Sequence, residues 1–335
     1  MKKALLYENI DKNQVICHVC AHECHVMSNQ SGVCHVRKNI DGDFVTLNSD
    51  RIIAMHMDPI EKKPLYHFLP GSISFSIAAM GCNFSCRFCQ NHSISIIHAE
   101  RDIRGEHVSP QQLVDTALKN HALSISYTYT EPTVFFELVL ETAQLAKKAG
   151  LRNVLVSNGY MTLQALAMLG PFLDAANIDL KSFNDGFYKK YCHARLQPVL
   201  ATLSALKAMG IWLEVTTLLI PGLNDDPLEI MQLISFLHNL DASIPWHVSR
   251  FFPQYQLQDI PPTSTGSIHN VLQCGVDAGL KFPYGGNIED SYWNDTHCPH
   301  CRETVVRRSG YVSDDRGLHH GNCRFCGEKI PGIWN

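Results

Sequence analysis

Short apolar runs alternate with amphipathic stretches between residues 73 and about 284. The apolar runs have the length of buried strands and occupy residues 73–79, 124–127, 153–156, 176–180, 213–219 and 246–251. The stretches between and after them have a helical period and occupy residues 109–121, 133–149, 162–169, 198–209, 227–240 and 266–278. Strands that alternate with helices predict βαβ units and therefore a parallel sheet covered by helices.

The boundaries of two helices agree with this pattern. Ser109 can cap the first helix, and a proline follows it. The stretch 133–149 follows a proline and ends before Gly150. The number of units predicts an α/β fold, a partial or full parallel (β/α) barrel with function at the carboxyl ends of the strands. A doubly wound open sheet is the competing arrangement, although no Gly-x-Gly-x-x-Gly follows the first strand.

Composition supports a folded chain with a large core. Hydrophobic residues make up 45% of the 335 residues and charged residues 18%. The net charge of −4 gives no general argument for a nucleic-acid partner, although it does not exclude a local basic patch. No apolar stretch approaches the length of a membrane span, and the first residues lack an apolar signal core. We therefore expect a cytoplasmic protein with no membrane partner.

Thirteen cysteines are unusual for a chain in this compartment, where thiols stay reduced. Eleven of them are clustered, and clustered thiolates favour zinc or iron–sulfur clusters over disulfides. Only Cys192 and Cys274 stand alone. The pattern predicts a cysteine-rich N-terminal metal-binding extension (1–70), a barrel (71–287) and a C-terminal zinc-ribbon-like module (288–335). The three groups are Cys17, Cys20, Cys24 and Cys34; Cys82, Cys86 and Cys89; and Cys298, Cys301, Cys323 and Cys326.

The central group, C-x3-C-x2-C, directly follows the first predicted strand. Three thiolates leave one iron of a four-iron, four-sulfur cluster without a protein ligand, and that iron can chelate the amino and carboxylate groups of S-adenosylmethionine (SAM). An electron from the reduced cluster would then break the sulfonium bond and release a 5′-deoxyadenosyl radical. The alternative is a zinc site completed by His92. The position of the loop at the end of a barrel strand favours the cluster.

This spacing, with the aromatic Phe88 before the last cysteine, resembles the radical SAM superfamily. The segment 58–71 (DPIEKKPLYHFLPG) and the run 89–91 (CQN) resemble more narrowly the radical SAM proteins of the AmmeMemoRadiSam system, relatives of the pyruvate formate-lyase activating enzymes. The resemblance covers nearly the whole chain, including both outer cysteine groups. It implies a [4Fe-4S] cluster, SAM, and hydrogen abstraction from a substrate such as a glycyl residue of a partner protein. It also implies an electron donor such as flavodoxin or ferredoxin, and Memo-like and AMMECR-like partner proteins.

Polar residues end three consecutive predicted strands. By the resemblance, 127–132 (YTYTEP) takes the place of a glycine-rich strand end that binds the SAM amino group. A carboxylate suits an ammonium or a ribose hydroxyl, and a lysine suits a carboxylate. The alternatives are an ordinary helix start, an Asn N-cap and a surface Asp–Lys pair. The predicted cofactor contacts are Phe88, Thr128, Thr130, Glu131, Ser157, Asn158, Asp179 and Lys181.

Two later strand ends carry further candidates. The segment 220–225 (IPGLND) resembles the family's Pro-Gly turn below the adenine. The last predicted strand puts His247, Arg250 and Tyr255 near the barrel mouth, where substrate or the SAM carboxylate could be bound. A lone histidine is more often structural than catalytic, so no catalytic residue is assigned.

The outer cysteine groups differ in spacing. Two C-x-x-C pairs near the C-terminus, separated by 21 residues, predict a four-thiolate zinc ribbon rather than free cysteines. The N-terminal spacing, C-x2-C-x3-C-x9-C, is compatible with zinc or with a second iron–sulfur cluster that relays electrons. Nearby histidines could replace a cysteine ligand, namely His18, His22, His25 and His35.

The leading hypothesis is thus a radical SAM enzyme with a [4Fe-4S] cluster, SAM and zinc. Radical modification of RNA or of a small molecule is a second enzymatic hypothesis, and the charge of the chain disfavours RNA. The non-enzymatic alternative is an interaction protein with several zinc sites, which predicts zinc at all three cysteine groups and no SAM binding.

Overall fold

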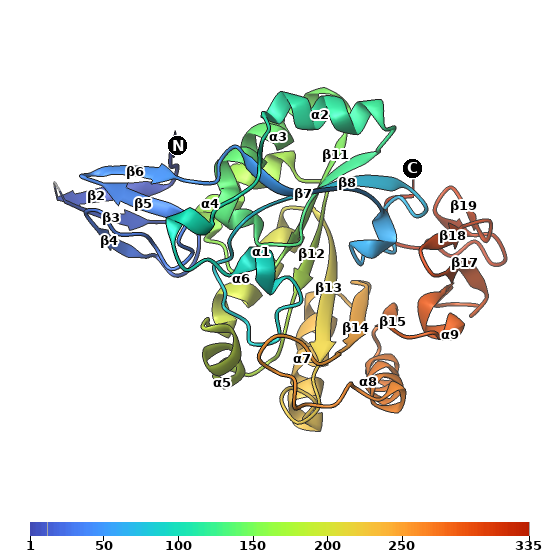
Figure 1. The fold of residues 1–335 in the computed structure, drawn as a ribbon. Coiled ribbons are helices and arrows are strands. Elements are labelled where there is room, and N and C mark those ends of the chain that lie inside the picture. Colours follow the sequence, from blue (N-terminus) through green and yellow to red (C-terminus); the bar gives the residue numbers. More distant parts are fainter. Residues whose placement is uncertain (12, 335) are drawn as a thin grey trace.

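One mixed sheet of nine strands organises the protein, seen in a computed structural model that describes residues 1–11 and 13–334 (Figure 1). Seven of its strands are parallel, and neighbours in the sheet are also consecutive in the chain. The order therefore runs in one direction, as in a barrel and unlike a doubly wound sheet. The parallel strands are β8 (Ile73–Ala79), β10 (Ser124–Tyr127), β11 (Arg152–Ser157), β12 (Ala175–Asp179), β13 (Trp212–Leu219), β14 (Trp246–Arg250) and β15 (Pro283–Gly286).

The sheet does not close. Among the described residues, the edge strands β15 and β9 (Glu106–His107) do not pair with each other, so the full-barrel version of the prediction is corrected to a partial barrel. Beyond β8, the antiparallel strand β7 (Arg51–Pro59) extends the sheet, and β9 pairs with β7. The sheet thus begins inside the segment 1–70, which the sequence analysis predicted to be an extension outside the barrel.

The helices between the parallel strands confirm the expected βαβ units. Ser109 caps the first of them, and its hydroxyl accepts a hydrogen bond from the amide of Gln112. The stretch 133–149 forms a short 3-10 turn and then a helix, because Pro132 starts the turn. No helix in the described part of the chain is long and apolar enough to span a bilayer. The helices are α2 (Pro110–Lys119), α3 (Phe136–Lys148), α4 (Leu163–Leu169), α6 (Leu196–Ala208), α7 (Pro227–Asp241) and α8 (Thr265–Asp277), with the short α1 (His92–Ser95), α5 (Asp185–Phe187) and α9 (Ser291–Asn294).

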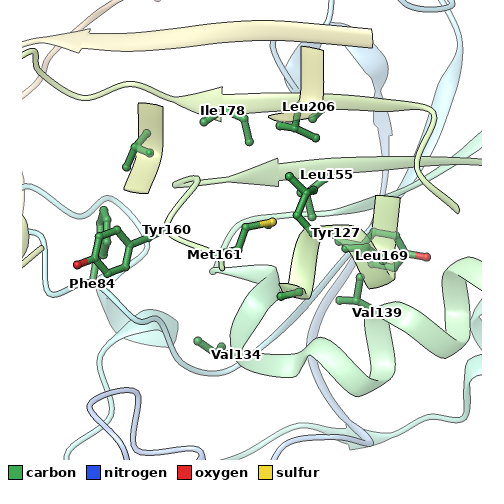
Figure 2. Close-up of a cluster of buried hydrophobic side chains, with 14 of the residues drawn as sticks. Phe84, Tyr127, Val134, Val139, Leu155, Tyr160, Met161, Leu169, Ile178 and Leu206 are labelled. Carbon is green, nitrogen blue, oxygen red and sulfur yellow. The ribbon is translucent and has the colours of Figure 1, made fainter. Parts of the chain in front are cut away.

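A hydrophobic layer joins the helices to the sheet. Figure 2 shows Val139 of α3 on the side of Tyr127 and Leu155, which come from neighbouring strands. All three side chains are fully buried. The Tyr127 hydroxyl donates to Asn153 at 2.9 Å, so this buried hydroxyl has a hydrogen-bond partner.

A segment that we call the plug (residues 60–69) fills the inner face of the sheet. Its apolar side chains pack on Val154 and Ala175, which lie in the first half of their strands. The buried carboxylate of Glu214 accepts hydrogen bonds from the backbone amides of Tyr66 at 2.9 Å and His67 at 2.8 Å. The plug therefore closes the barrel at the amino ends of its strands.

The C-terminal module (residues 291–334) packs against the outside of the plug. Arg308 donates to the carbonyl of Tyr66 at 2.7 Å, and a ring nitrogen of His67 lies 2.6 Å from the carbonyl of Pro331. Figure 1 shows this module and the N-terminal one on opposite sides of the barrel. Its strands are β16 (Thr296–His297), β17 (Thr304–Ser309), β18 (Val312–Asp314), β19 (Leu318–His319) and β20 (Asn322–Cys323).

The N-terminal module (residues 1–50) consists of two three-stranded antiparallel sheets, and α3 anchors it. The guanidinium of Arg37 forms a fully buried ion pair with Glu137 in the first turn of α3. The same carboxylate accepts a hydrogen bond from the amide of Leu5 at 2.7 Å. The strands are β1 (Lys2–Lys3), β5 (Arg37–Ile40) and β6 (Asp43–Thr46) in one sheet and β2 (Tyr7–Asp11), β3 (Gln14–Cys17) and β4 (His25–Met27) in the other.

We expect Glu137→Ala to lower the free energy of unfolding by roughly 3–5 kcal/mol, because it leaves the buried Arg37 charge without its partner. Anaerobic urea denaturation measures this change. The control is Glu141→Ala, one turn along the same helix, whose pair with Lys2 is about 40% exposed and contributes less than ~1 kcal/mol. Equal losses in the two variants would contradict the assigned role of the Arg37–Glu137 pair.

Candidate active site

The central cysteine loop leaves the carboxyl end of β8, where the sequence predicted it. Cys86 is buried, and Cys82 and Cys89 are partly buried. The loop turns at Gly81, whose φ of +111° falls in the region that favours glycine. A Cβ at this position would stand 3.0 Å from Val36, so glycine also allows the close approach of the N-terminal module.

The three sulfurs of this loop are less closely gathered than the four C-terminal sulfurs. Among the residues that the structure describes, no three ligand atoms of Cys82, Cys86, Cys89 and His92 all lie within 4.8 Å of one another. A tetrahedral zinc with four thiolates holds its sulfurs about 3.8 Å apart. A four-iron cluster takes each sulfur on a different iron and so needs wider spacing. The ring of His92 stacks on Tyr255 with ring centroids 4.7 Å apart, and its Nδ1 lies 3.3 Å from the carbonyl of Cys89.

Burial disfavours free thiolates in this loop. Burial raises the pKa of Cys82 well above its usual value, and the nearby Glu131 charge raises it further. Burial also raises the pKa of Cys89. Because the thiolate is the metal ligand, these two residues need the positive charge of bound iron in order to ionise.

Cys192, which stands alone in the sequence, lies beside the loop. A hydrogen bond with its thiol lowers the pKa of Cys86. The carbonyl of Cys192 accepts a hydrogen bond from the amide of Ser85 at 3.2 Å, and the carbonyl of Tyr191 accepts one from the backbone amide of Arg87 at 3.0 Å. Sequence analysis missed this contact, because a π-helical turn over Tyr188–Cys192 makes it across more than 100 residues of chain.

Asn158, at the end of β11, is the predicted cofactor residue that lies next to the loop. Its side-chain amide donates to Asn83 at 2.7 Å and lies 3.9 Å from the sulfur of Cys82. On the other side of the loop, Asn91 donates to the carbonyl of Tyr129 at 2.7 Å. The loop is therefore tied to the ends of both β10 and β11.

Glu131 is buried, and protein donors occupy both of its carboxylate oxygens. Ser157 donates to it at 2.8 Å and the amide of Asn158 at 2.8 Å. The amide and hydroxyl of Thr133 donate at 3.2 and 3.0 Å. Burial raises the pKa of this carboxyl, against the effect of these bonds. The arrangement makes Glu131 a residue that positions Asn158.

The remaining predicted cofactor residues lie along the same edge. The hydroxyl of Thr130 donates to the carbonyl of Ala79 at 2.7 Å, and Thr128, two positions earlier in the chain, is also buried. Asp179 and Lys181 form an ion pair at 2.7 Å. The ammonium of this lysine lies 6.0 Å from the ring centroid of Phe88 in the cysteine loop. The edge thus presents charged and polar groups within the reach of one small ligand.

The three barrel-mouth candidates are not brought together. Tyr255 stacks on His92 beside the cysteine loop, and Arg250 ends β14 and donates to the carbonyl of Thr263 at 2.6 Å. His247 instead lies at the second position of β14, buried, with a ring nitrogen 2.7 Å from Glu214. It belongs with the plug at the closed end of the barrel.

The outer cysteine groups differ in geometry. The four C-terminal sulfurs all lie within 4.8 Å of one another and could hold a metal ion. Two pairs of these sulfurs, Cys298 with Cys326 and Cys301 with Cys323, stand 3.6 Å apart. The four N-terminal cysteines line a single small cavity.

Comparisons with known proteins agree with this geometry. Residues 77–234 match the family model of the Radical SAM superfamily. An uncharacterised protein of Methanocaldococcus jannaschii is 38% identical over 98% of this chain and 99% of its own length. This chain contains a radical SAM domain. The pyruvate formate-lyase-activating enzyme of Listeria monocytogenes is 24% identical to this radical SAM enzyme over 63% of this chain and 83% of the relative.

Solved structures support the same fold. The crystal structure of Streptococcus suis SuiB bound to SAM superposes with a TM-score of 0.53 and 12% identity, over 69% of this chain and 53% of that protein. A radical SAM domain implies an enzyme that uses a [4Fe-4S] cluster and SAM. The cluster, when bound, supplies the electron that splits SAM into methionine and a 5′-deoxyadenosyl radical.

We expect Glu131→Ala to lower the free energy of unfolding by about 1–3 kcal/mol, because it leaves the amide of Asn158 buried without an acceptor. Urea denaturation of the cluster-free protein measures this effect without SAM. Ser157→Ala, which removes only one of the donors and leaves the carboxylate in place, serves as the milder control. A loss in Glu131→Ala no larger than in the control would contradict the positioning role.

Proposed function

We propose that this enzyme cleaves SAM at a cluster held by Cys82, Cys86 and Cys89 and abstracts a hydrogen atom from a glycyl residue of a partner protein. One observation carries the proposal. A loop with three widely spaced cysteines leaves the first parallel strand, and the polar ends of the next three strands face the same edge of the sheet. Three protein ligands leave one iron free for SAM.

The chain's own residues would orient SAM at this edge. Asn158 stands next to Cys82 and offers an amide to the polar groups of the methionine part. Lys181 suits a carboxylate and Asp179 a ribose hydroxyl, once their mutual ion pair opens. Phe88 lies beside the lysine and limits the volume of the site. Thr128 and Thr130 would line the same edge, with Glu131 and Ser157 as its support.

A buried polar cluster connects Tyr129, which follows β10, to the plug. The hydroxyl of Tyr129 contacts the carboxylate of Asp58, and the buried ammonium of Lys63 lies 2.6 Å from the same carboxylate. The ammonium also lies 4.4 Å from the ring centroid of Tyr129. Burial lowers the pKa of Lys63 to about 8, against the opposing attraction of Asp58. These contacts would hold Tyr129 in place beside the cysteine loop.

Relatives favour a polypeptide substrate. The pyruvate formate-lyase-activating enzymes are named for action on a protein, and SuiB has been crystallised with its precursor peptide. In the proposed reaction, the glycyl Cα–H bond breaks, its hydrogen atom forms 5′-deoxyadenosine, and the unpaired electron stays on the glycyl carbon. Small-molecule and RNA substrates remain the alternatives, and the net charge of −4 speaks against RNA.

The partners follow from the same proposal. A flavodoxin or ferredoxin would supply the electron, and Memo-like and AMMECR-like proteins are the further candidates that the AmmeMemoRadiSam resemblance names. We also propose zinc in the C-terminal module, since sulfur separations of 3.6 Å match the value of about 3.8 Å that tetrahedral zinc requires. We further propose a cytoplasmic location, where thiols stay reduced.

We expect Cys86→Ala to abolish 5′-deoxyadenosine formation in anaerobically reconstituted, dithionite-reduced enzyme, while about one zinc per chain is retained. Chromatography of the nucleoside and elemental analysis of the protein measure the two effects. Cys274→Ala, which removes an exposed cysteine outside all three groups, should change neither. Continued nucleoside formation by Cys86→Ala would refute the cluster assignment.

The substrate class can be tested by isotope transfer. We expect deuterium in 5′-deoxyadenosine when the enzyme acts on a protein extract of its host grown with α-deuterated glycine, because the abstracted hydrogen comes from a glycyl carbon. An extract labelled with deuterated leucine is the control. Nucleoside formation that an extract stimulates without deuterium transfer would rule out the glycyl residue, and loss of stimulation after ribonuclease treatment would favour RNA.

A further inference from the structure

The N-terminal module gathers four cysteines around one small cavity. They come from the end of β3, the turn before β4 and the turn before β5, so the folded backbone brings them together. None of them forms a disulfide. The wall of the cavity contains Cys17, Cys20, Cys24, Cys34, Arg37 and Asn83.

The N-terminal sulfurs are less closely gathered than the C-terminal ones. All four C-terminal sulfurs lie within 4.8 Å of one another, whereas no three of the N-terminal sulfurs do so among the described residues. One zinc ion binds all its thiolates at a single centre about 2.3 Å away, whereas a cubane cluster spreads them over four irons. The N-terminal arrangement therefore favours a cluster over a single zinc ion.

Nearby histidines are not part of this cavity. His22 uses a ring nitrogen to contact the carbonyl of Asn83 at 2.8 Å, and His18 faces the carboxylates of Glu8 and Glu23. The side chains of the remaining two, His25 and His35, are exposed. Ligation by four thiolates is thus the arrangement that the wall offers.

A buried positive charge lies beside the sulfurs. One guanidinium nitrogen of Arg37 lies 3.9 Å from the sulfur of Cys17, and this arginine is nearly fully buried. A cluster with four thiolate ligands carries net negative charge, and the Arg37 guanidinium, which also pairs with Glu137, would attract it. Hydrogen bonds and charges near the ligating sulfurs also set the reduction potential of such a cluster.

The cavity directly adjoins the SAM cluster loop. Asn83, which forms part of its wall, is the residue that follows Cys82, and Asn158 bonds to its side chain. The module is docked here by further bonds: Thr162 donates to the carbonyl of His18 at 2.6 Å, and the amide of Ala21 donates to the carbonyl of Tyr160. A residue of the cavity wall is thus the chain neighbour of a predicted ligand of the first cluster.

We propose that Cys17, Cys20, Cys24 and Cys34 hold a second four-iron, four-sulfur cluster that passes electrons to the SAM cluster. A reduced flavodoxin or ferredoxin gives one electron to the second cluster, which is reduced. The second cluster then gives that electron to the SAM cluster and is reoxidised, and no bond is made or broken. The relay role rests on the proposed function, whereas the metal site stands apart from it.

The metal site is tested in a variant that lacks all three ligands of the SAM cluster, Cys82→Ala/Cys86→Ala/Cys89→Ala, purified anaerobically. We expect it to retain about four iron and four sulfide per chain, out of about eight each in the wild type, with an electron paramagnetic resonance signal after dithionite reduction. Loss of all iron, or a second zinc per chain in its place, would overturn the site. The wild-type iron count gives the same answer if this variant does not fold.

The relay is tested in Cys20→Ala/Cys24→Ala, whose retained zinc and SAM-responsive cluster signal report that it is folded. We expect about tenfold slower 5′-deoxyadenosine formation with reduced flavodoxin, and a change of less than about twofold with dithionite, a small reductant that can reach the SAM cluster directly. Equal effects with both reductants, or no effect with flavodoxin, would overturn the relay. Absence of nucleoside from the wild type would instead count against the proposed function and would leave the iron count standing.

Discussion

The buried carboxylate of Glu131 is the interaction on which the arrangement of the active edge depends. It accepts four hydrogen bonds from the 3-10 turn before α3 and from the end of β11, and thereby fixes the backbone of Asn158. Asn158 in turn holds Asn83 in the cysteine loop, and the carbonyl of Asn83 meets His22 of the N-terminal module. One continuous set of polar contacts therefore connects the barrel, the loop and the module. In a buried setting each of these bonds is expensive to leave unmade, so the set behaves as a unit.

The parallel strands and their helices could be predicted from the sequence because each is recognisable from its own local pattern. The bounds of β8 and β10 agree with the expected runs, and Ser109 caps its helix as expected. The strand β7 was not predicted, since its burial does not alternate and its partner lies beyond the plug. The open edge of the sheet could not be predicted either, because strand pairing depends on residues far apart in the chain and not on a local pattern.

The same limit applies to the site. Polar residues at strand ends could be found from the sequence, because the carboxyl ends of parallel strands share an edge. The environment of each residue could not be predicted, because it depends on distant partners. Glu131 accepts hydrogen bonds from Ser157 and Asn158 at the end of β11, and His247 is paired with Glu214 at the opposite end of the barrel. The cysteine groups show this most clearly. C-x2-C occurs in both outer groups, yet their sulfurs differ in spacing, because only the C-terminal hairpins bring all four thiols to one point.

The plug also bears on the order of events at the active edge. Residues 60–69 and the C-terminal module cover the amino ends of the strands, so the carboxyl ends are the side from which ligands would approach the cysteine loop. A polypeptide partner of the kind proposed, seated at the carboxyl ends, would cover the cofactor position beneath it. SAM would then have to enter before that partner docks, and binding would follow a fixed sequence.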